Sequence, residues 1–160
     1  MGNKINGVVW DMMSKRVRLI KESELEQLLS LYKYLIPEDP KLEIDSTLKK
    51  HWDDILSDPS LFYVVAEEND KLVSSCNITI IKNLTREAKP YGLIENVITH
   101  PDYRNKGYGT LVLEKALEIA GDKNCYKVML MTSRKDEKTF HFYEKSGFDR
   151  REKTAFIVRI

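Results

Sequence analysis

The stretch that decides the fold of this chain is residues 104–109, Arg104-Asn105-Lys106-Gly107-Tyr108-Gly109. An apolar run, 93–99, comes before it, and a helical pattern begins at Tyr108. A strand that feeds a glycine loop at a helix N-terminus forms a phosphate site, because the free N–H groups and the helix dipole both favour an anion. The two glycines let the backbone approach a bulky ligand closely. The stretch therefore predicts a site for a phosphate-bearing cofactor.

Two better-known phosphate motifs are absent from the chain. It has no G-x-x-x-x-G-K-[ST] loop, and Val112 stands where a dinucleotide fingerprint would have its third glycine. A Gly-x-Gly pair alone is a weak signal, so a helix entry that binds nothing stays the alternative at this point.

Length and composition limit the function classes. A chain of 160 residues is expected to form one domain, 1–160. A net charge of +1 argues against a partner that is nucleic acid or a membrane surface. No run is long enough for a membrane span, and residues 1–14 do not resemble a signal peptide. We therefore expect a soluble cytoplasmic protein.

Nothing in the sequence indicates a metal site. Cys76 and Cys125 lie in apolar runs and form no C-x-x-C pair, so both are predicted to be buried thiols. His51, His100 and His141 have no metal-ligand spacing.

Hydrophobic periodicity predicts alternating strands and helices. The expected strands are 16–20, 61–66, 72–81, 91–99, 126–131 and 155–160, and strand 126–131 reads as buried on both faces. The expected helices are 25–35 after a capping box at 23–26, then 45–56, 108–120 with Gly121 just past its end, and 137–145. This order predicts an α+β fold with helices on both faces of a mixed sheet.

Two motifs together resemble a known family. Pro101-x-x-Arg104-x-x-Gly107-x-Gly109, after strand 95–99, resembles the acetyl-coenzyme A motif of the GNAT N-acetyltransferase superfamily. The later stretch Phe142-Tyr143-Glu144-Lys145-Ser146-Gly147-Phe148 resembles that family's F-Y-x-x-x-G-F motif. The resemblance implies the GNAT-type acyl-CoA N-acyltransferase fold, with a central, mostly antiparallel mixed sheet, and acetyl-CoA as cosubstrate.

The resemblance also implies a set of cofactor-binding residues. Backbone groups of residues 97–99 would hold the pantetheine arm like an added strand, and residues 105–110 would hold the pyrophosphate. Asp136 stands where the family usually has Asn, and a carboxylate cannot donate the corresponding hydrogen bond. The implied set is Val97, Ile98, Thr99, Arg104, Asn105, Lys106, Gly107, Tyr108, Gly109, Thr110, Asp136 and Tyr143.

Acetyl transfer to an amine needs proton transfer, because an alkylamine is mostly protonated at neutral pH. Glu95 is the candidate base, directly or through water, and we expect its side chain on the same face of the strand as Val97 and Thr99. A backbone N–H near Ile98 would polarise the thioester carbonyl, and Tyr143 would protonate the leaving thiolate. A structural carboxylate and a core aromatic remain the alternatives for Glu95 and Tyr143.

The acceptor is the least determined part of the function. The leading hypothesis is direct transfer, in a ternary complex, to a primary amine of a small molecule. Acetylation of a protein lysine or N-terminus, and a CoA-binding regulatory module with little turnover, stay as alternatives; each is compatible with a homodimer. Acidic residues in 37–58 could favour a polycationic amine, although a solvated helix face is the favoured explanation for them. Residues 124–128 and Glu95 resemble glucosamine-6-phosphate N-acetyltransferases, but Asn96 departs from that pattern.

Overall fold

The structure is a computed structural model that describes residues 15–160. Its strands are β1 (Arg16–Leu19), β2 (Leu61–Glu68), β3 (Lys71–Ile81), β4 (Tyr91–Thr99) and β5 (Val128–Leu130). Its helices are α2 (Leu25–Tyr32), α3 (Ser46–Ser57), α4 (Tyr108–Asp122) and α5 (Glu137–Lys145), with two 3-10 turns, η1 (Glu22–Glu24) and η2 (Pro101–Tyr103).

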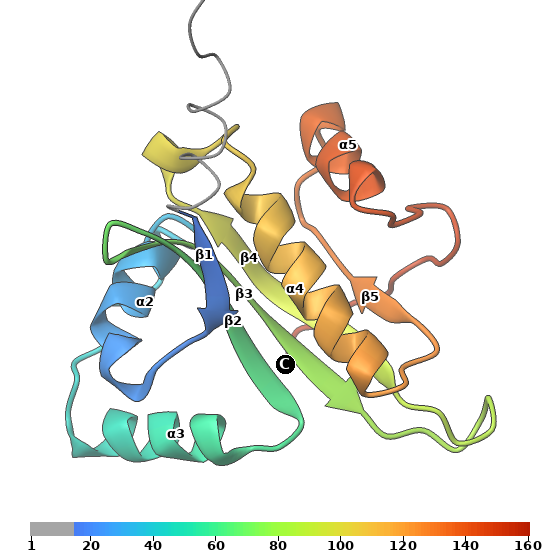
Figure 1. Cartoon of the computed structure of the whole chain (residues 1–160), viewed down its shortest axis with the longest axis horizontal. Helices are drawn as coiled ribbons and strands as arrows, with labels where there is room; N and C mark the ends of the chain where they lie inside the picture. Colours follow the sequence, from blue (N-terminus) through green and yellow to red (C-terminus); the bar gives the residue numbers. More distant parts are fainter. Residues whose placement is uncertain (1–14) are drawn as a thin grey trace, which may run out of the picture.

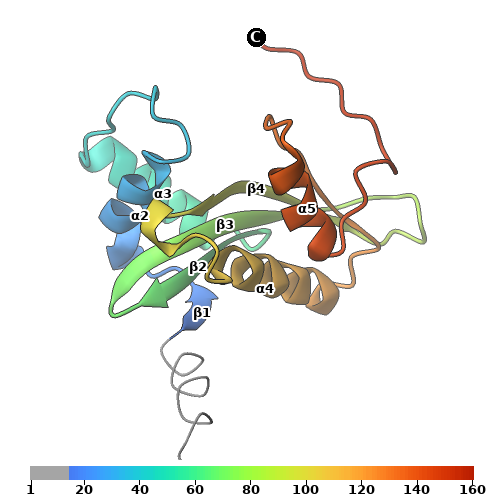
Figure 2. The same cartoon turned by 90° about the horizontal axis from the view of Figure 1, so that it is seen from above.

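Within the described residues, the strands form one sheet in the order β1-β2-β3-β4-β5. Neighbours from β1 to β4 are antiparallel, and β5 is parallel to β4. Helix α4 covers one face, α2 and α3 cover the other, and α5 lies beside the start of α4 (Figures 1 and 2). This is the α+β arrangement that the element order predicted.

Alternation along the strands builds a separate core on each face. Val64 and Ala66 of β2 pack with Val112 and Leu113 of α4 in one buried cluster. Val65, between them in the sequence, packs on the other face in a cluster whose further members are Ile20, Leu25, Leu28, Trp52 and Leu72. The central strands are therefore buried on both sides, which fixes their register.

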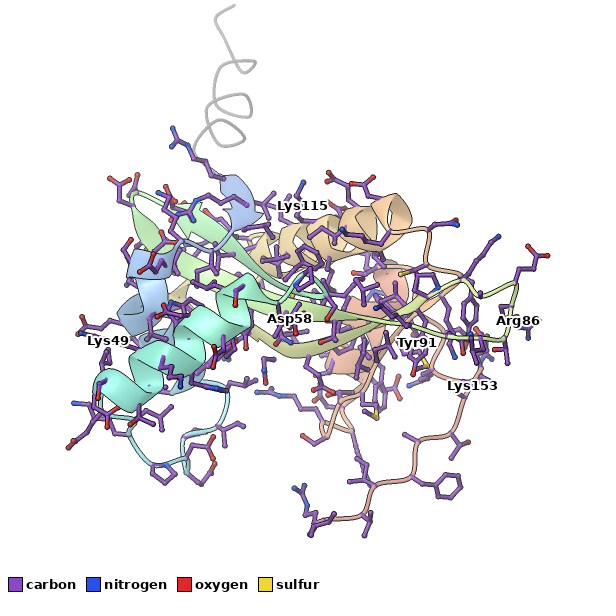
Figure 3. The ribbon with its side chains drawn as sticks, turned by 90° about the horizontal axis from the view of Figure 1, so that it is seen from below. Lys49, Asp58, Arg86, Tyr91, Lys115 and Lys153 are labelled. Carbon is purple, nitrogen blue, oxygen red and sulfur yellow. The ribbon has the colours of Figure 1, made fainter. Side chains whose placement is uncertain are left out.

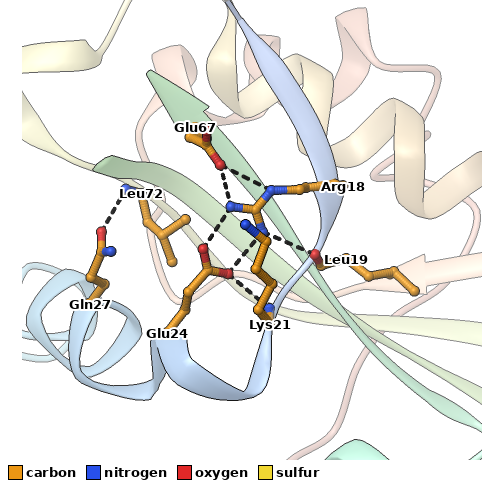
Figure 4. Close-up of polar contacts among 7 residues, drawn as sticks. All are labelled: Arg18, Leu19, Lys21, Glu24, Gln27, Glu67 and Leu72. Atoms are coloured by element: carbon orange, nitrogen blue, oxygen red, sulfur yellow. Dashed lines mark hydrogen bonds and ion pairs between the residues drawn. The ribbon is translucent and has the colours of Figure 1, made fainter. Parts of the chain in front are cut away.

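A buried ion cluster fastens β1 to the rest of the sheet (Figure 4). The Arg18 guanidinium donates to both carboxylate oxygens of Glu24, at 2.7 and 2.8 Å, and also to Glu67 of β2. Glu24 in turn accepts from the Lys21 N–H at 2.8 Å. These bonds, chiefly those from Arg18, lower the pKa of the Glu24 carboxyl. One guanidinium therefore positions an edge strand, a 3-10 turn and β2 at once.

Several predicted elements differ from the observed ones. The first helix ends at Tyr32. The capping box expected at 23–26 is not formed there; instead the Glu24 carboxylate accepts from the backbone N–H of Lys21. Helix α4 continues to Asp122, so Gly121 lies in its last turn. β5 has only three residues, and all three are partly exposed, because its pairing with β4 ends at Ile94.

The strand expected at 155–160 is not formed. These residues have no regular secondary structure, and their large side chains stay exposed. Their alternating pattern favours a strand, but a strand also needs an edge to pair with.

The Arg18 cluster can be tested by removing its cation. Arg18→Met should destabilise the fold by about 2–4 kcal/mol, because it leaves two largely buried carboxylates unpaired. Urea unfolding near pH 7 measures the loss. The folded-state pKa of Glu24 is depressed, so the stabilisation exists above its unfolded pKa and the difference should shrink below about pH 4.

Arg16→Met, at the exposed first position of the same strand, is the matched control and should change stability by less than about 0.5 kcal/mol. Equal effects of the two substitutions would show that the cluster contributes nothing specific.

Candidate functional site

The site is organised by a bulge in β4. Asn77 of β3 lies opposite Glu95, but Ser75 lies opposite Ile98, so two β4 residues, Asn96 and Val97, face one residue of β3. Asn96 has a φ of 55°, in the left-handed region that Asn tolerates better than most side chains. Its amide donates to Asn77 Oδ1 at 2.9 Å. A bulge of this kind bends the strand and shifts its alternation.

The bend separates β4 from β5. The two strands pair only between Gly92–Ile94 and Val128–Leu130. Beyond Ile94, in the part of the chain that the structure describes, β4 has no strand partner on its β5 side. A gap with one open strand edge therefore lies inside the sheet.

Backbone direction shows which groups of β4 face this gap. His100 N–H donates to Val73 on β3 at 2.8 Å, and the carbonyl of Ile98 accepts from Ser74 on β3 at 2.8 Å. Since the direction of backbone groups alternates along a strand, the N–H groups of Val97 and Thr99 face the gap. The Ile98 N–H, expected near the thioester, points toward β3.

The bulge also moves Glu95 to the other face of the sheet. Glu95 lies opposite Asn77 of β3, and Asn77 lies opposite Tyr63 of β2. Tyr63 packs in the cluster formed with α2 and α3, so Glu95 lies on that face of the sheet. Val97 packs in the α4 core, and the Thr99 hydroxyl lies on that same side, near Gly109. The expectation that these side chains share a face is therefore wrong, because it assumed unbroken alternation through Asn96. The bond from Asn96 to Asn77 places the Asn96 side chain on the same face as Glu95.

The glycine loop lies at the end of β4 nearest the gap. Gly107 is the N-cap of α4 with a φ of 87°, and a Cβ placed there would meet no protein atom within 4 Å. Asn105 is also left-handed, with a φ of 60°. Arg104 Nε donates to the Thr99 carbonyl at 3.2 Å, and Lys106 lies over the Tyr103 ring. The loop thus presents backbone N–H groups and positive charge around open space.

Two residues of this motif have structural duties. Tyr108 is fully buried, and its hydroxyl donates to Glu68 Oε1 at 2.5 Å, so its ring belongs to the core. A Cβ on Gly109 would lie 3.0 Å from Phe142 Cζ and 3.3 Å from Thr99 Oγ1. Glycine at 109 therefore lets α4 and α5 approach each other, a role that the motif alone did not reveal.

Helix α5 carries Tyr143 to the α4 core. Asp136 caps this helix, and its two carboxylate oxygens accept from the N–H and the hydroxyl of Thr139, each at 2.9 Å. The Tyr143 ring packs against Phe142 and Phe148 and joins the α4 core. Burial raises the pKa of the Tyr143 phenol, although the nearby Arg134 charge opposes that rise.

Sequence reasoning missed two hydroxyls on the Glu95 face. Tyr32 Oη and Ser75 Oγ are buried, and among the described residues neither makes a hydrogen bond of ordinary geometry. Burial raises the pKa of the Tyr32 phenol, and the Ser75 hydroxyl beside it opposes the rise. A serine pair inside the apolar strand β3 was the available signal, but only the fold brings Tyr32 to it.

Comparison with known proteins identifies the family. Residues 25–148 match the sequence profile of the acetyltransferase (GNAT) family. The chain belongs to this family. It is therefore an N-acetyltransferase by descent, as the paired motifs predicted, and the GNAT fold expected from them is confirmed.

Individual relatives agree with this assignment. A glucosamine 6-phosphate N-acetyltransferase of Trypanosoma brucei brucei is 30% identical over 145 residues, which cover 89% of this chain and 95% of the relative. A solved structure from Agrobacterium tumefaciens str. C58, provisionally described as an acetyltransferase, has a TM-score of 0.85 and 41% identity, covering 91% of this chain and 99% of its own. A Clostridium acetobutylicum protein solved with acetyl-CoA has a TM-score of 0.70 and 23% identity over 90% of this chain and 96% of its own, which supports the fold alone.

No helix between residues 15 and 160 is both long enough and apolar enough to cross a membrane.

The positive φ of Asn96 can be tested by substitution. Asn96→Val should destabilise the fold by about 1–3 kcal/mol more than Asn96→Gly does, because a β-branched residue resists positive φ and glycine does not. Both substitutions remove the bond to Asn77, so their difference isolates the backbone requirement. Urea unfolding of the two variants measures it, and equal midpoints would refute the left-handed bulge.

Proposed function

We propose that this protein transfers an acetyl group from acetyl-CoA directly to a primary amine of a small molecule. The observation that carries this proposal is the gap between β4 and β5. The glycine loop lies at one end of this gap, Tyr143 packs on the α4 face of the sheet, and the partly buried carboxylate of Glu95 lies on the other face.

The donor fits this gap chemically. A pantetheine arm contains amide groups, so it can lie along β4 as an added strand and pair with the backbone groups of Val97 and Thr99. The pyrophosphate then falls at residues 105–110, where the loop and the start of α4 offer N–H groups. Arg104 and Lys106 add charge at the exposed rim of this loop.

The thioester end would lie at the apex of the gap, beside Val97. An N–H group that faces the gap there can stabilise the oxyanion that forms when the amine attacks. In this proposal Tyr143 gives its phenol proton to the departing thiolate. Because burial keeps the phenol pKa above its ordinary value, Tyr143 stays protonated throughout the neutral range.

Glu95 supplies the base in this proposal. Among the described residues its carboxylate makes no hydrogen bond and no ion pair, although its side chain is partly buried. A carboxylate held this way, without a structural partner, is available to take a proton from the ammonium or from a water between them. Its position on the α2 and α3 face implies that the acceptor approaches from that side, while the donor lies in the gap.

Direct transfer agrees with the state of the cysteines. The Cys76 thiol is fully buried, and burial raises its pKa to about 12. Burial also raises the pKa of the Cys125 thiol. A thiol that stays protonated is a poor nucleophile, so neither residue is suited to carry an acetyl group.

The acceptor remains the open part of the proposal. The T. brucei brucei relative takes its name from glucosamine 6-phosphate, which makes amino sugars and their phosphates the first candidates. Among the acidic residues at 37–58, Asp45 and Asp58 have structural roles, since Asp45 caps α3 and Asp58 binds Ser60.

An amine panel tests the function. The purified chain is incubated with acetyl-CoA and amino sugars, amino sugar phosphates, polyamines, aminoglycosides or lysine peptides, and free thiol is measured. We expect turnover with one small-molecule class. Turnover with peptides alone would favour protein acetylation, and cofactor binding without any turnover would favour a regulatory module. A melting temperature that acetyl-CoA does not raise would refute all three.

The cradle predicts a position-specific loss of cofactor binding. Gly107→Ala should weaken acetyl-CoA binding at least about tenfold, because its Cβ projects into the open space that the pyrophosphate would fill. Isothermal titration measures the affinity. Gly147→Ala is the matched control, since Gly147 has a similar φ of 92° and equally open surroundings. It should bear the same backbone strain and still bind, so equal binding by both variants would contradict the cradle.

The acid and base roles predict separable effects on kcat. Tyr143→Phe and Glu95→Gln should each lower kcat by about 10²-fold or more, with little change in acetyl-CoA affinity. The raised phenol pKa has a further consequence, since Tyr143 acts as an acid only below its pKa. Wild-type kcat should therefore show no loss from this group below about pH 10. Unchanged turnover in either variant would remove that residue's role.

A further inference from the structure

Lys15, just before β1, contacts the glycine loop that opens α4. Its ammonium group donates to the backbone carbonyl of Lys106 at 2.9 Å, a contact between residues 91 positions apart in the sequence. The same ammonium lies 5.2 Å from the centre of the Tyr108 ring. Helix α4 packs against both β1 and β2, and this packing brings the two distant segments together.

The bond from Lys15 orients one peptide unit of the loop. A trans peptide is planar, so the carbonyl of Lys106 and the N–H of Gly107 point in opposite directions. Because the carbonyl is directed at Lys15, the Gly107 N–H is directed away from it. Among residues 15–160 this N–H has no hydrogen-bond acceptor, so it is available to a ligand.

Gly107 does not fix this orientation by itself. Its φ is 87°, and glycine adopts positive and negative φ about equally well. Turning the 106–107 peptide over would change this φ by about 180°, which glycine tolerates, and would point the Lys106 carbonyl oxygen where the N–H now points. A carbonyl dipole with that direction would repel an anion. A group outside the glycine must therefore select the orientation.

The Tyr108 ring gives Lys15 a rigid support. The ring is fully buried, and its hydroxyl donates to Glu68 Oε1 at 2.5 Å. An ammonium group is attracted to the face of such a ring. Lys15 is itself half-buried, so its ammonium is held between a fixed ring and a loop carbonyl.

We propose that Lys15 is a positioning residue for the pyrophosphate of acetyl-CoA. It acts through the Lys106 carbonyl, from the side of the peptide away from the ligand, and does not touch the phosphate. The inference rests on the proposed function, because it takes acetyl-CoA as the ligand of the loop. An N–H that is oriented in advance binds an anion more tightly, since the loop needs no rearrangement when the ligand arrives.

The first test is the affinity of purified variants for acetyl-CoA, measured by isothermal titration. Lys15→Met keeps the apolar stem of the side chain and removes the donor, so it should weaken binding about tenfold. Lys15→Arg keeps a charged donor and should bind within about threefold of the wild type. A loss of the same size in both variants would contradict a role that depends on donation to the carbonyl.

Lys71→Met is the matched control, since Lys71 lies 5.7 Å from the centre of the Tyr103 ring and contributes charge beside the same loop. Lys115, labelled in Figure 3, lies about two turns further along α4 and pairs with Glu118, so Lys115→Met controls for charge on the helix. Both variants should bind within about twofold of the wild type. Equal weakening by Lys15→Met and Lys71→Met would show that charge alone matters and would overturn the proposal.

The second test examines the peptide without any cofactor. Nuclear magnetic resonance of the ¹³C,¹⁵N-labelled chain reports the Lys106 carbonyl carbon and the Gly107 amide. Both resonances should shift in Lys15→Met and stay in place in Lys71→Met, because only Lys15 donates to that carbonyl. Unchanged resonances in Lys15→Met would overturn the proposed orientation.

The two proposals fail in different ways. A wild type that does not bind acetyl-CoA would refute the proposed function and the positioning role together. A wild type that binds acetyl-CoA, with a Lys15→Met variant that binds it equally well, would overturn the positioning role and leave the proposed function intact.

Discussion

The bulge at Asn96 is the constraint on which the rest of the site depends. Parallel strands normally stay paired along their length, which would close the edge of β4 completely. One left-handed residue turns β4 away from β5, leaves Val97 and Thr99 with backbone groups facing open space, and moves Glu95 to the opposite face. The proposed donor site and the Glu95 carboxylate lie on separate sides of β4 because of a single extra residue in the ladder.

The two sides of β4 present different kinds of chemical groups. The side proposed to bind the donor consists largely of backbone, namely the open edge of β4, the left-handed loop and the start of α4. Backbone recognition needs few fixed side chains, so it can persist among relatives that share only 30% identity. The Glu95 side consists of side chains that come from three elements, including the hydroxyls of Tyr32 and Ser75. In the proposed function, the choice of acceptor belongs to this side.

Local signals explain what could be predicted from the sequence. The glycine at 107, the apolar stripe of α4 and the motif around Tyr143 each depend on a few neighbouring residues, and all three lie as expected. The face of Glu95 could not be predicted, because the bulge at Asn96 depends on the pairing of two strands distant in sequence. Gly121 was predicted to lie just past the end of α4, but the helix continues one residue beyond it, to Asp122. The strand predicted at 155–160 is not formed, because a hydrophobic pattern does not by itself provide a neighbouring strand edge to pair with.

Tyr108 has a consequence for the kinetics of cofactor exchange. The residue that opens α4 is also a fully buried ring, whose hydroxyl is bonded to Glu68 at the end of β2. A loop fastened in this way cannot swing open without pulling a tyrosine out of the core. At the proposed cofactor site, the cofactor should therefore enter and leave by diffusion, and its exchange rate should follow the viscosity of the solvent more closely than any slow motion of the protein.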